Sequence, residues 1–315
     1  MSSQPEALEN VSGEESAWDS VLERVSCLQG RQRTVESLPG GLTNVNLKVT
    51  TAEDCVVVRI AQVGSELLSI DRLAEFESSK AAEDAGVGAP VVEFSQDAGV
   101  LVVGFIEGHT FTDDDLRHGG HLQRVAEACR LLHGARRCVQ DFDMFRIQER
   151  YLRIVQEHGF RMPDRYADFM PQVRRIERAL AARPTQTVPC NNDLLAGNFI
   201  DDGSKIWLID YEYGGNNDPC FELGNVWSEA GLSLDQLEEL MAAYDGRPLR
   251  HRIARARLQG LMSKYGWTLW ASIQSAVSDI DFDFWSWGME KYDRAVAEFD
   301  GADFDRLLDE VQLDT

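Results

Sequence analysis

The stretch from Pro189 to Tyr213 restricts the fold and function of this chain more than any other part of the sequence. Two short apolar segments flank a turn at Asp201–Ser204, a pattern that predicts a β-hairpin. Asp193 precedes the first strand, Asn198 begins it, and Asp210 follows the second strand. Because a hairpin brings its two ends together, we expect these three polar side chains to converge on one small volume.

Two carboxylates and one amide oxygen form a donor set that suits a hard cation such as Mg²⁺. In this arrangement one carboxylate remains available as a general base. Aspartate and asparagine are also ordinary turn residues, and any one of them alone would be interpreted as such. The order and spacing of all three favour a functional cluster.

Composition limits the class of protein. The chain has 315 residues, 43% of them hydrophobic and 27% charged, which is typical of a globular protein with one large domain or two lobes. No apolar run approaches a membrane span, and the N-terminus lacks a signal-peptide pattern. The net charge of −22 argues against nucleic acid or an anionic membrane as a partner. The six cysteines are scattered without a CxxC pair, so we expect a cytoplasmic protein.

The order of expected elements predicts an α+β protein with two lobes. Residues 1–17 are acidic and poor in large apolar side chains, and we expect a disordered tail. Residues 18–106 are expected to form a small antiparallel-sheet lobe, and residues 107–315 a larger helical lobe. Within the first lobe we expect helices at 16–28 and 70–85 and strands at 35–38, 45–50, 56–60, 91–94 and 100–106. Within the second we expect helices at 113–116, 122–132, 145–157, 166–182, 221–230, 234–244, 250–276, 284–299 and 304–311, with a turn at 214–219.

A glycine turn between two strands of the first lobe can lay backbone amides over phosphate groups. Gly40 and Gly41 stand at such a turn, Arg59 ends a later strand, and Glu75 lies on the following helix. Taken singly, each has an ordinary structural explanation. A sheet lobe followed by a helical lobe with a carboxylate-bearing hairpin favours a nucleotide site, in which Arg59 reaches the phosphates and pairs with Glu75.

The segments C-N-N-D-L-L-A-G-N and L-I-D-Y-E-Y resemble the choline/ethanolamine kinase family, within the protein-kinase-like and aminoglycoside-phosphotransferase group. The family pattern is H-x-D-x-x-x-x-N followed by an aspartate at the end of the next strand. The resemblance extends from about Leu38 to Phe299. It implies a two-lobed protein-kinase-like fold and ATP with Mg²⁺ as cofactors.

The resemblance also implies roles for individual residues. Asp193 would be the general base, and Asn198 and Asp210 would hold Mg²⁺. Glu212 lies two residues beyond Asp210 on the same strand face and would add a metal contact, although a solvated carboxylate fits the sequence equally well. The residues implied for nucleotide binding are Gly41, Thr43, Asn44, Arg59, Glu75, Phe105, Ile106 and Glu107.

The sequence departs from the family pattern at one position, where Asn191 replaces the histidine. That histidine supports the catalytic loop in the family and does not take the substrate proton. Because asparagine still donates and accepts hydrogen bonds, we expect weaker positioning of the loop and not a loss of chemistry.

The C-terminal helices carry aromatic residues that suit a cationic substrate. Trp267 and Trp270 are three residues apart, so they lie on one helix face. Tryptophans with this spacing more often belong to a core. A quaternary ammonium group, however, is best held by aromatic faces and a nearby carboxylate. The resemblance implies a substrate site made of Tyr213, Glu229, Trp267, Trp270 and Trp287.

The sequence therefore predicts an ATP-dependent kinase that phosphorylates choline, active as a monomer or homodimer. Ethanolamine, another small amino alcohol or an aminoglycoside remain as alternative acceptors. Two further alternatives are a non-catalytic protein that binds quaternary ammonium compounds, and a small-molecule kinase whose tryptophans are only core residues.

Overall fold

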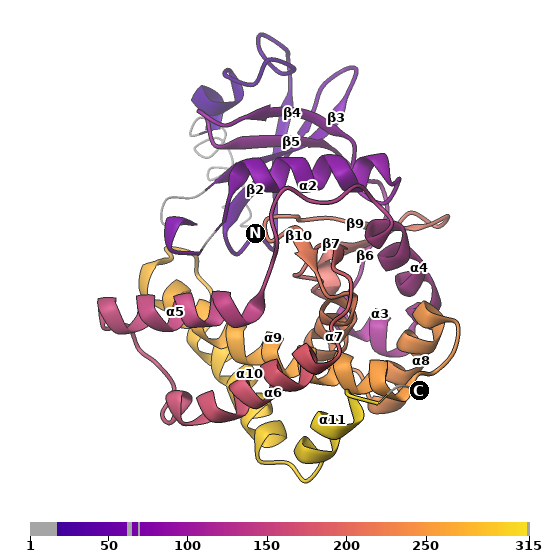
Figure 1. The fold of residues 1–315 in the computed structure, drawn as a ribbon. Helices are drawn as coiled ribbons and strands as arrows, with labels where there is room; N and C mark the ends of the chain where they lie inside the picture. The colour runs from indigo at the N-terminus through magenta and orange to yellow at the C-terminus, as the bar shows by residue number, and fades with distance from the viewer. Residues whose placement is uncertain (1–17, 62–64, 69, 314–315) are drawn as a thin grey trace, which may run out of the picture. The chain divides into compact units, whose positions relative to one another are not determined.

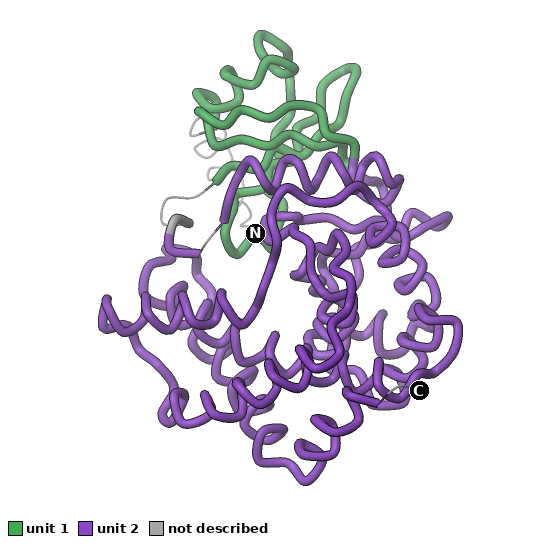
Figure 2. The backbone as a smooth tube through the Cα atoms, in the orientation of Figure 1, with its two compact units in different colours: residues 1–62, 90–105 green, residues 63–89, 106–315 purple. Residues whose placement is uncertain are grey.

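The computed structural model describes residues 18–61, 65–68 and 70–313, which form two compact units (Figures 1 and 2). Unit 1 comprises residues 1–62 and 90–105, and unit 2 comprises residues 63–89 and 106–315. The helix expected at 70–85 is grouped with unit 2 by its contacts. The acidic tail 1–17 lies outside the described residues.

Unit 1 is a five-stranded antiparallel sheet with the strand order β1-β2-β3-β5-β4. Its strands are β1 (Thr34–Leu38), β2 (Asn44–Thr50), β3 (Cys55–Ala61), β4 (Val91–Ser95) and β5 (Val100–Gly104). Alternating apolar side chains such as Leu47, Val49, Val56 and Val58 point to one face and are buried there. All five strands agree with the sequence prediction within a few residues.

The segment that covers this sheet is less helical than expected. In the predicted helix 16–28, the described residues start at 18, and of these only 18–22 are helical. Turns follow them. Leu22, Val25 and Leu28 nevertheless belong to the buried cluster on the sheet. The carboxylate of Glu93 accepts hydrogen bonds from the backbone N–H groups of Ser26 (2.9 Å) and Cys27 (3.0 Å). These two N–H groups are therefore bonded to the sheet and do not continue the helix.

Unit 2 is mainly helical and is organised around the 28-residue helix α9 (Arg250–Val277) (Figure 1). Nearly all residues of α9 from Ala254 to Gln274 are buried. The other helices are α2 (Arg72–Asp84), α3 (Asp113–His118), α4 (Leu122–His133), α5 (Met144–His158), α6 (Met170–Ala182), α7 (Pro219–Ala230), α8 (Leu234–Asp245), α10 (Phe284–Phe299) and α11 (Phe304–Glu310). Short 3₁₀ turns occur at Ser65–Leu68, Tyr166–Phe169 and Ala196–Asn198. Helices α5, α7 and α10 pack against α9.

Helix α7 approaches α9 closely because glycines stand at their crossing. A Cβ atom on Gly224 would lie 2.2 Å from the carbonyl oxygen of Ala256, which no side chain tolerates. Asp218 caps α7 by accepting a hydrogen bond from the N–H of Cys220 (2.9 Å), and its other oxygen pairs with Arg255 of α9. Two of the helices that carry the predicted substrate residues are thereby fixed to each other.

Two small sheets position the hairpin that carries the predicted catalytic residues. Strands β8 (Phe199–Asp201) and β9 (Ile206–Leu208) form the predicted hairpin, and β6 (His109–Thr110) pairs with β8. The prediction of a turn at 214–219 was wrong for its centre, because β10 (Gly215–Asn217) is a strand that pairs antiparallel with β7 (Val188–Cys190). Among the described residues, no helix has the length and apolarity needed to cross a membrane.

Candidate active site

The loop between β7 and β8 and the end of β9 bring the predicted catalytic residues together. The side-chain amide of Asn198 donates a hydrogen bond to the backbone carbonyl of Asp193 (2.7 Å). The backbone N–H of Ile209 donates to the carbonyl of Asn198 (3.0 Å), which places Asp210 next to the same loop. Because the amide nitrogen of Asn198 faces Asp193, its oxygen remains as the atom that can bind a cation.

Asp210 has an unusual backbone conformation. Its φ angle is +63°, in the left-handed region that non-glycine residues seldom adopt. The side-chain amide of Asn191 donates to the carbonyl oxygens of Ile209 (3.0 Å) and Asp210 (2.8 Å) and holds this conformation. Strained backbone of this kind is concentrated at functional sites.

Asn191 supports the loop more fully than we expected from the missing histidine. It is completely buried, and besides its bonds to the end of β9, its side-chain oxygen accepts a hydrogen bond from the backbone N–H of Asp193 (3.0 Å). One amide thus connects the backbone of the proposed base to that of the proposed metal ligand. These contacts give no reason to expect weakened positioning.

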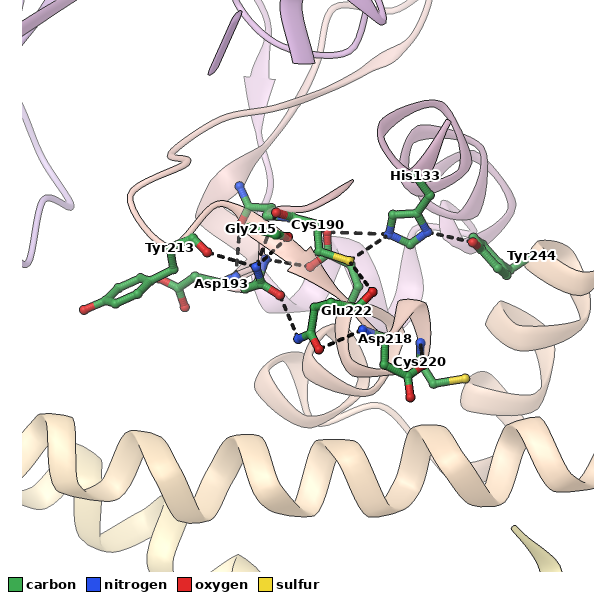
Figure 3. A network of polar contacts seen from close by, with 12 residues as sticks. His133, Cys190, Asp193, Tyr213, Gly215, Asp218, Cys220, Glu222 and Tyr244 are labelled. Carbon is green, nitrogen blue, oxygen red and sulfur yellow. Dashed lines mark hydrogen bonds and ion pairs between the residues drawn. The ribbon is translucent and has the colours of Figure 1, made fainter. Parts of the chain in front are cut away.

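A buried polar network lies beneath the loop (Figure 3). The carboxylate of Glu222 on α7 accepts hydrogen bonds from the backbone N–H groups of Asn191 (2.8 Å) and Asn192 (2.7 Å). Asn192 has φ +70°, and its side chain donates to the carbonyl of Tyr213 (2.9 Å) and accepts from Asn217 (2.9 Å). The loop is therefore held from β10 and α7 as well as from its own hairpin.

His133, Cys190 and Glu222 place three possible metal-binding atoms within 4.8 Å of one another. His133 contacts the Cys190 sulfur (3.6 Å) with Nε2 and the Tyr244 hydroxyl (2.7 Å) with Nδ1, as Figure 3 shows. Both oxygens of Glu222 already accept backbone N–H bonds, and burial raises the pKa of the Cys190 thiol well above its usual range. The cluster is therefore better explained as support for the loop than as a metal site.

We expect replacement of Glu222 by glutamine to destabilise the fold strongly. The glutamine amide would point a donor at one of the two N–H groups, which would lose its partner in a buried site. The free energy of unfolding should fall by about 2–4 kcal/mol. Urea denaturation would measure this, with exposed Glu157→Gln on α5 as the control within about 0.5 kcal/mol of the wild type. A loss as small as the control's would contradict the assigned role of Glu222.

The carboxylates around Asp193 create a strong concentration of negative charge. Burial raises the pKa of Asp193 well above its usual range, and the charges of Glu212 and Asp210 raise it further. Oxygen donors that repel one another in this way fit a divalent cation, whose charge would relieve the repulsion. The residues present therefore fit Mg²⁺.

Glu212 is buried, so the interpretation as a solvated carboxylate was wrong. Arg72 on α2 contacts Glu75 (2.8 Å) and Glu212 (3.8 Å) through the same nitrogen, Nη1. Both glutamates are nearly inaccessible to solvent. Arg72 thus connects the helix that carries Glu75 to the strand end that carries Asp210, and it balances part of the negative charge there.

The residues predicted to bind the nucleotide are divided between the two units. Gly41 lies at the tight turn between β1 and β2, where a Cβ atom would lie 2.3 Å from the carbonyl of Asn44. Thr43 and Asn44 are buried at the start of β2, and Arg59 lies in β3 opposite Asn46 of β2. Phe105 ends unit 1, and Ile106 and Glu107 begin the following segment of unit 2. Since Arg59 and Glu75 belong to different units, their predicted pairing stays a prediction.

Four of the predicted substrate residues form an aromatic cluster, which we define as Tyr213, Trp267, Trp270 and Trp287; the first three are buried and Trp287 is half-buried. The Tyr213 ring meets Trp267 edge to face with ring centroids 4.8 Å apart, and the indole N–H of Trp270 donates to the Tyr213 hydroxyl (2.8 Å). The rings of Trp270 and Trp287 are 5.6 Å apart, also edge to face. Tyr213 lies three residues after Asp210, so the cluster begins next to the hairpin that carries the predicted catalytic residues.

The fifth predicted substrate residue, Glu229 on α7, is paired with a residue that sequence analysis missed. Its carboxylate forms an ion pair with Lys291 of α10, and both side chains are buried. Lys291 lies four residues after Trp287, and its ammonium nitrogen is 3.9 Å from the centre of a Trp287 ring. Glu222 and Asn192 also received no site role from the sequence, because the partners that give them one are distant in the chain. Arg72 received none either, although Glu75 is only three residues further along its helix.

A sheet-rich unit, a helical unit and a carboxylate-bearing loop with an asparagine and a second aspartate define a protein-kinase-like phosphotransferase. The sequence matches the choline/ethanolamine kinase family over residues 35–254. The chain belongs to the choline/ethanolamine kinase family and is a small-molecule kinase.

Individual relatives agree with this assignment. A choline/ethanolamine kinase family protein from Mesorhizobium loti is 31% identical, with a TM-score of 0.82 over 96% of this chain and 99% of the other. The choline kinase LicA from Streptococcus pneumoniae has the same fold, with 24% identity and a TM-score of 0.73 over 91% and 99% of the two chains. A probable ethanolamine kinase from Arabidopsis thaliana is 25% identical over 302 residues, covering 82% of this chain and 78% of that protein.

Proposed function

We propose that the protein transfers the γ-phosphoryl group of ATP to the hydroxyl group of choline, giving phosphocholine and ADP. The observation that carries this proposal is the position of Tyr213. It follows Asp210 by three residues and contacts both Trp267 and Trp270. One short segment therefore joins the proposed phosphoryl-transfer site to an aromatic cluster suited to a quaternary ammonium group.

Asp193 is the proposed general base. The choline hydroxyl oxygen attacks the γ-phosphorus, the bond to the bridging oxygen of ADP breaks, and the hydroxyl proton passes to the Asp193 carboxylate. Burial and the neighbouring carboxylates raise the pKa of Asp193, which makes its ionised form a stronger base. Asn191 and Glu222 keep the loop in place, so positioning supplies a large part of the rate.

Asn198, Asp210 and Glu212 would hold Mg²⁺. When bound, the ion neutralises negative charge on the phosphate groups. Arg72 keeps Glu212 fixed through the ion pair described above. The residues proposed to bind ATP are Gly41, Thr43, Asn44, Arg59, Glu75, Phe105, Ile106 and Glu107.

A cytoplasmic location is also proposed, because all six cysteines, each within the described residues, are free thiols.

Ethanolamine is the second candidate substrate. In the described structure, Oε1 of Glu229 is buried without a hydrogen-bond partner. A primary ammonium group can donate a hydrogen bond to this oxygen, whereas the quaternary group of choline cannot. Several similar proteins are named ethanolamine kinases, among them one from Rattus norvegicus that is 28% identical over 287 residues.

Replacement of Trp267 by leucine tests the role of the aromatic cluster. We expect the KM for choline to rise about two- to thirtyfold through loss of a cation–π contact, while the KM for ATP stays unchanged. Trp227→Leu is the matched control, because Trp227 is a buried tryptophan on α7 outside the cluster. Equal increases in the two KM values, or equal effects of the two variants, would show that Trp267 is only a packing residue.

A further inference from the structure

Lys291 is a buried cation at the edge of the aromatic cluster. It projects from α10, is only 5% exposed, and is one of five lysines in the chain. Its ammonium group pairs with Glu229 and lies 3.9 Å from the centre of a Trp287 ring. A carboxylate and an indole face are the two partners that recognise an ammonium group in a desolvated site.

These two partners are also predicted to receive the substrate. Glu229 and Trp287 are the proposed carboxylate and aromatic face for the acceptor's ammonium group, and in this structure a lysine of the same chain engages both. A buried ion pair offsets the large desolvation cost of each charge. A second cation arriving at Glu229 therefore finds the attraction of the carboxylate already cancelled.

We propose that Lys291 is a specificity-determining residue that competes with the acceptor's ammonium group for Glu229 and Trp287. The inference rests on the proposed function, because it concerns the acceptor side of the same site. It implies that the lysine ammonium must leave the pair before Glu229 contributes to substrate binding. The apparent affinity is then reduced in proportion to the fraction of molecules in which Lys291 has moved away.

Two further observations support this competition. Glu229 raises the pKa of Asp193 and Lys291 lowers it, so the pair lies within electrostatic range of the proposed base. Only Oε2 of Glu229 bonds to Lys291, and Oε1 remains buried without a partner in the described chain. Once Lys291 leaves Oε2, both oxygens of Glu229 can therefore face an incoming ammonium group.

A second buried lysine offers a matched control. Lys264 of α9 pairs with Glu298, and its ammonium nitrogen lies 4.6 Å from the centre of a Trp227 ring. Burial lowers the pKa of Lys264. It therefore shares the carboxylate, the indole face and the burial of Lys291, but its ion pair is with Glu298 and its ring contact is with Trp227, and Glu229 acts on it only through its charge. Replacement of Lys264 therefore removes a buried cation but leaves the ion pair between Lys291 and Glu229 in place.

The test compares Lys291→Met with Lys264→Met, since methionine keeps most of the length of lysine without its charge. Isothermal titration calorimetry with tetramethylammonium reports binding of a quaternary cation that cannot be phosphorylated. We expect Lys291→Met to bind it at least about tenfold more tightly than the wild type, and Lys264→Met to bind it like the wild type. The KM for choline should fall in Lys291→Met, with the KM for ATP unchanged.

A measurement on the wild-type protein covers the case in which Lys291→Met does not fold. Lysine side-chain ¹⁵N NMR resolves few signals here because the chain has five lysines. Saturating tetramethylammonium should shift the Lys291 ammonium signal and leave the Lys264 signal in place. Tetramethylammonium binding that leaves the Lys291 signal unchanged would overturn the proposal, as would equal or weaker binding by folded Lys291→Met.

The same experiments separate this inference from the proposed function. Turnover of choline together with unchanged tetramethylammonium affinity in Lys291→Met would overturn the role of Lys291 and leave the kinase assignment intact. Tighter binding by Lys291→Met without turnover of any amino alcohol would support the competition and contradict choline phosphorylation. If neither the wild type nor Lys291→Met binds tetramethylammonium, the proposal of an ammonium site is itself wrong.

Discussion

Replacement of Asp193 by asparagine is expected to remove nearly all activity and to raise the melting temperature of the ligand-free protein. Loss of a general base reduces turnover by about 10²- to 10⁴-fold. The same substitution should increase stability although it lowers turnover, because burial and the charges of Glu212 and Asp210 raise the pKa of Asp193 in the folded protein. The ionised carboxylate is therefore costly in the fold, and a neutral amide removes that cost.

The sign follows from proton linkage. A carboxyl group with a raised pKa binds its proton more tightly in the folded than in the unfolded chain. The contribution to stability is therefore full below the pKa of the unfolded chain and is lost as the pH rises toward the folded pKa. At neutral pH the wild type has lost this contribution, whereas the asparagine variant has no such dependence. The difference in melting temperature between the two proteins should thus grow from pH 4 toward neutrality.

Initial rates of ADP release and thermal denaturation at several pH values measure both effects. Asp202→Asn is the control, because hydrogen bonds from Lys205, Ser204 and Trp207 lower the pKa of this exposed turn residue. It should lower stability at neutral pH and leave the rate unchanged. A lower melting temperature for Asp193→Asn than for the wild type would contradict the electrostatic description of the site.

Replacement of Asp210 by asparagine should reduce turnover by about 10²- to 10³-fold, which is typical for loss of one strong electrostatic contact to a reacting group. Asparagine is chosen because it tolerates the left-handed conformation at φ +63°. The bonds from Asn191 to the backbone carbonyls of Ile209 and Asp210 do not involve the side chain. The fold should therefore persist, and the change isolates the charge of one proposed metal ligand.

A Mg²⁺ titration of the rate distinguishes this loss from a general defect. Asp210→Asn should require a higher Mg²⁺ concentration for half-maximal rate, whereas Glu157→Gln should behave like the wild type. Circular dichroism checks that the variant keeps its helical content. An unchanged Mg²⁺ requirement together with full activity would exclude Asp210 as a ligand.

Much of the fold follows from local sequence patterns. The strands of unit 1 have alternating apolar residues, and the helices of unit 2 have helical periodicity, so both could be predicted without the structure. The grouping of Asp193, Asn198 and Asp210 was also predictable, because the hairpin that gathers them is local. The two turns that we predicted from clusters of glycine and polar residues had different outcomes in the structure. The turn predicted at 201–204 is present at 202–205, between β8 and β9, but 215–217 form a strand because β7 supplies its pairing partner.

Contacts over long sequence separations were not predictable in the same way. The helix expected at 16–28 ends early because Glu93, more than 60 residues away, accepts the N–H groups of Ser26 and Cys27. Lys291 has the spacing of an ordinary helical residue, and its partner Glu229 is 62 residues distant. Likewise, nothing local marks Glu222 as the acceptor for the loop. Each of these residues acquires its role only from the packing of separate helices.

The central claim is that this chain phosphorylates a small amino alcohol, and an assay of acceptor-dependent ADP release tests it most directly. The purified protein is incubated with Mg²⁺–ATP and either choline, ethanolamine, an aminoglycoside or no acceptor. We predict a rate with choline well above the rate without acceptor, with ethanolamine as the second substrate and no stimulation by the aminoglycoside. Equal rates with and without either amino alcohol, from a folded protein, would contradict the claim.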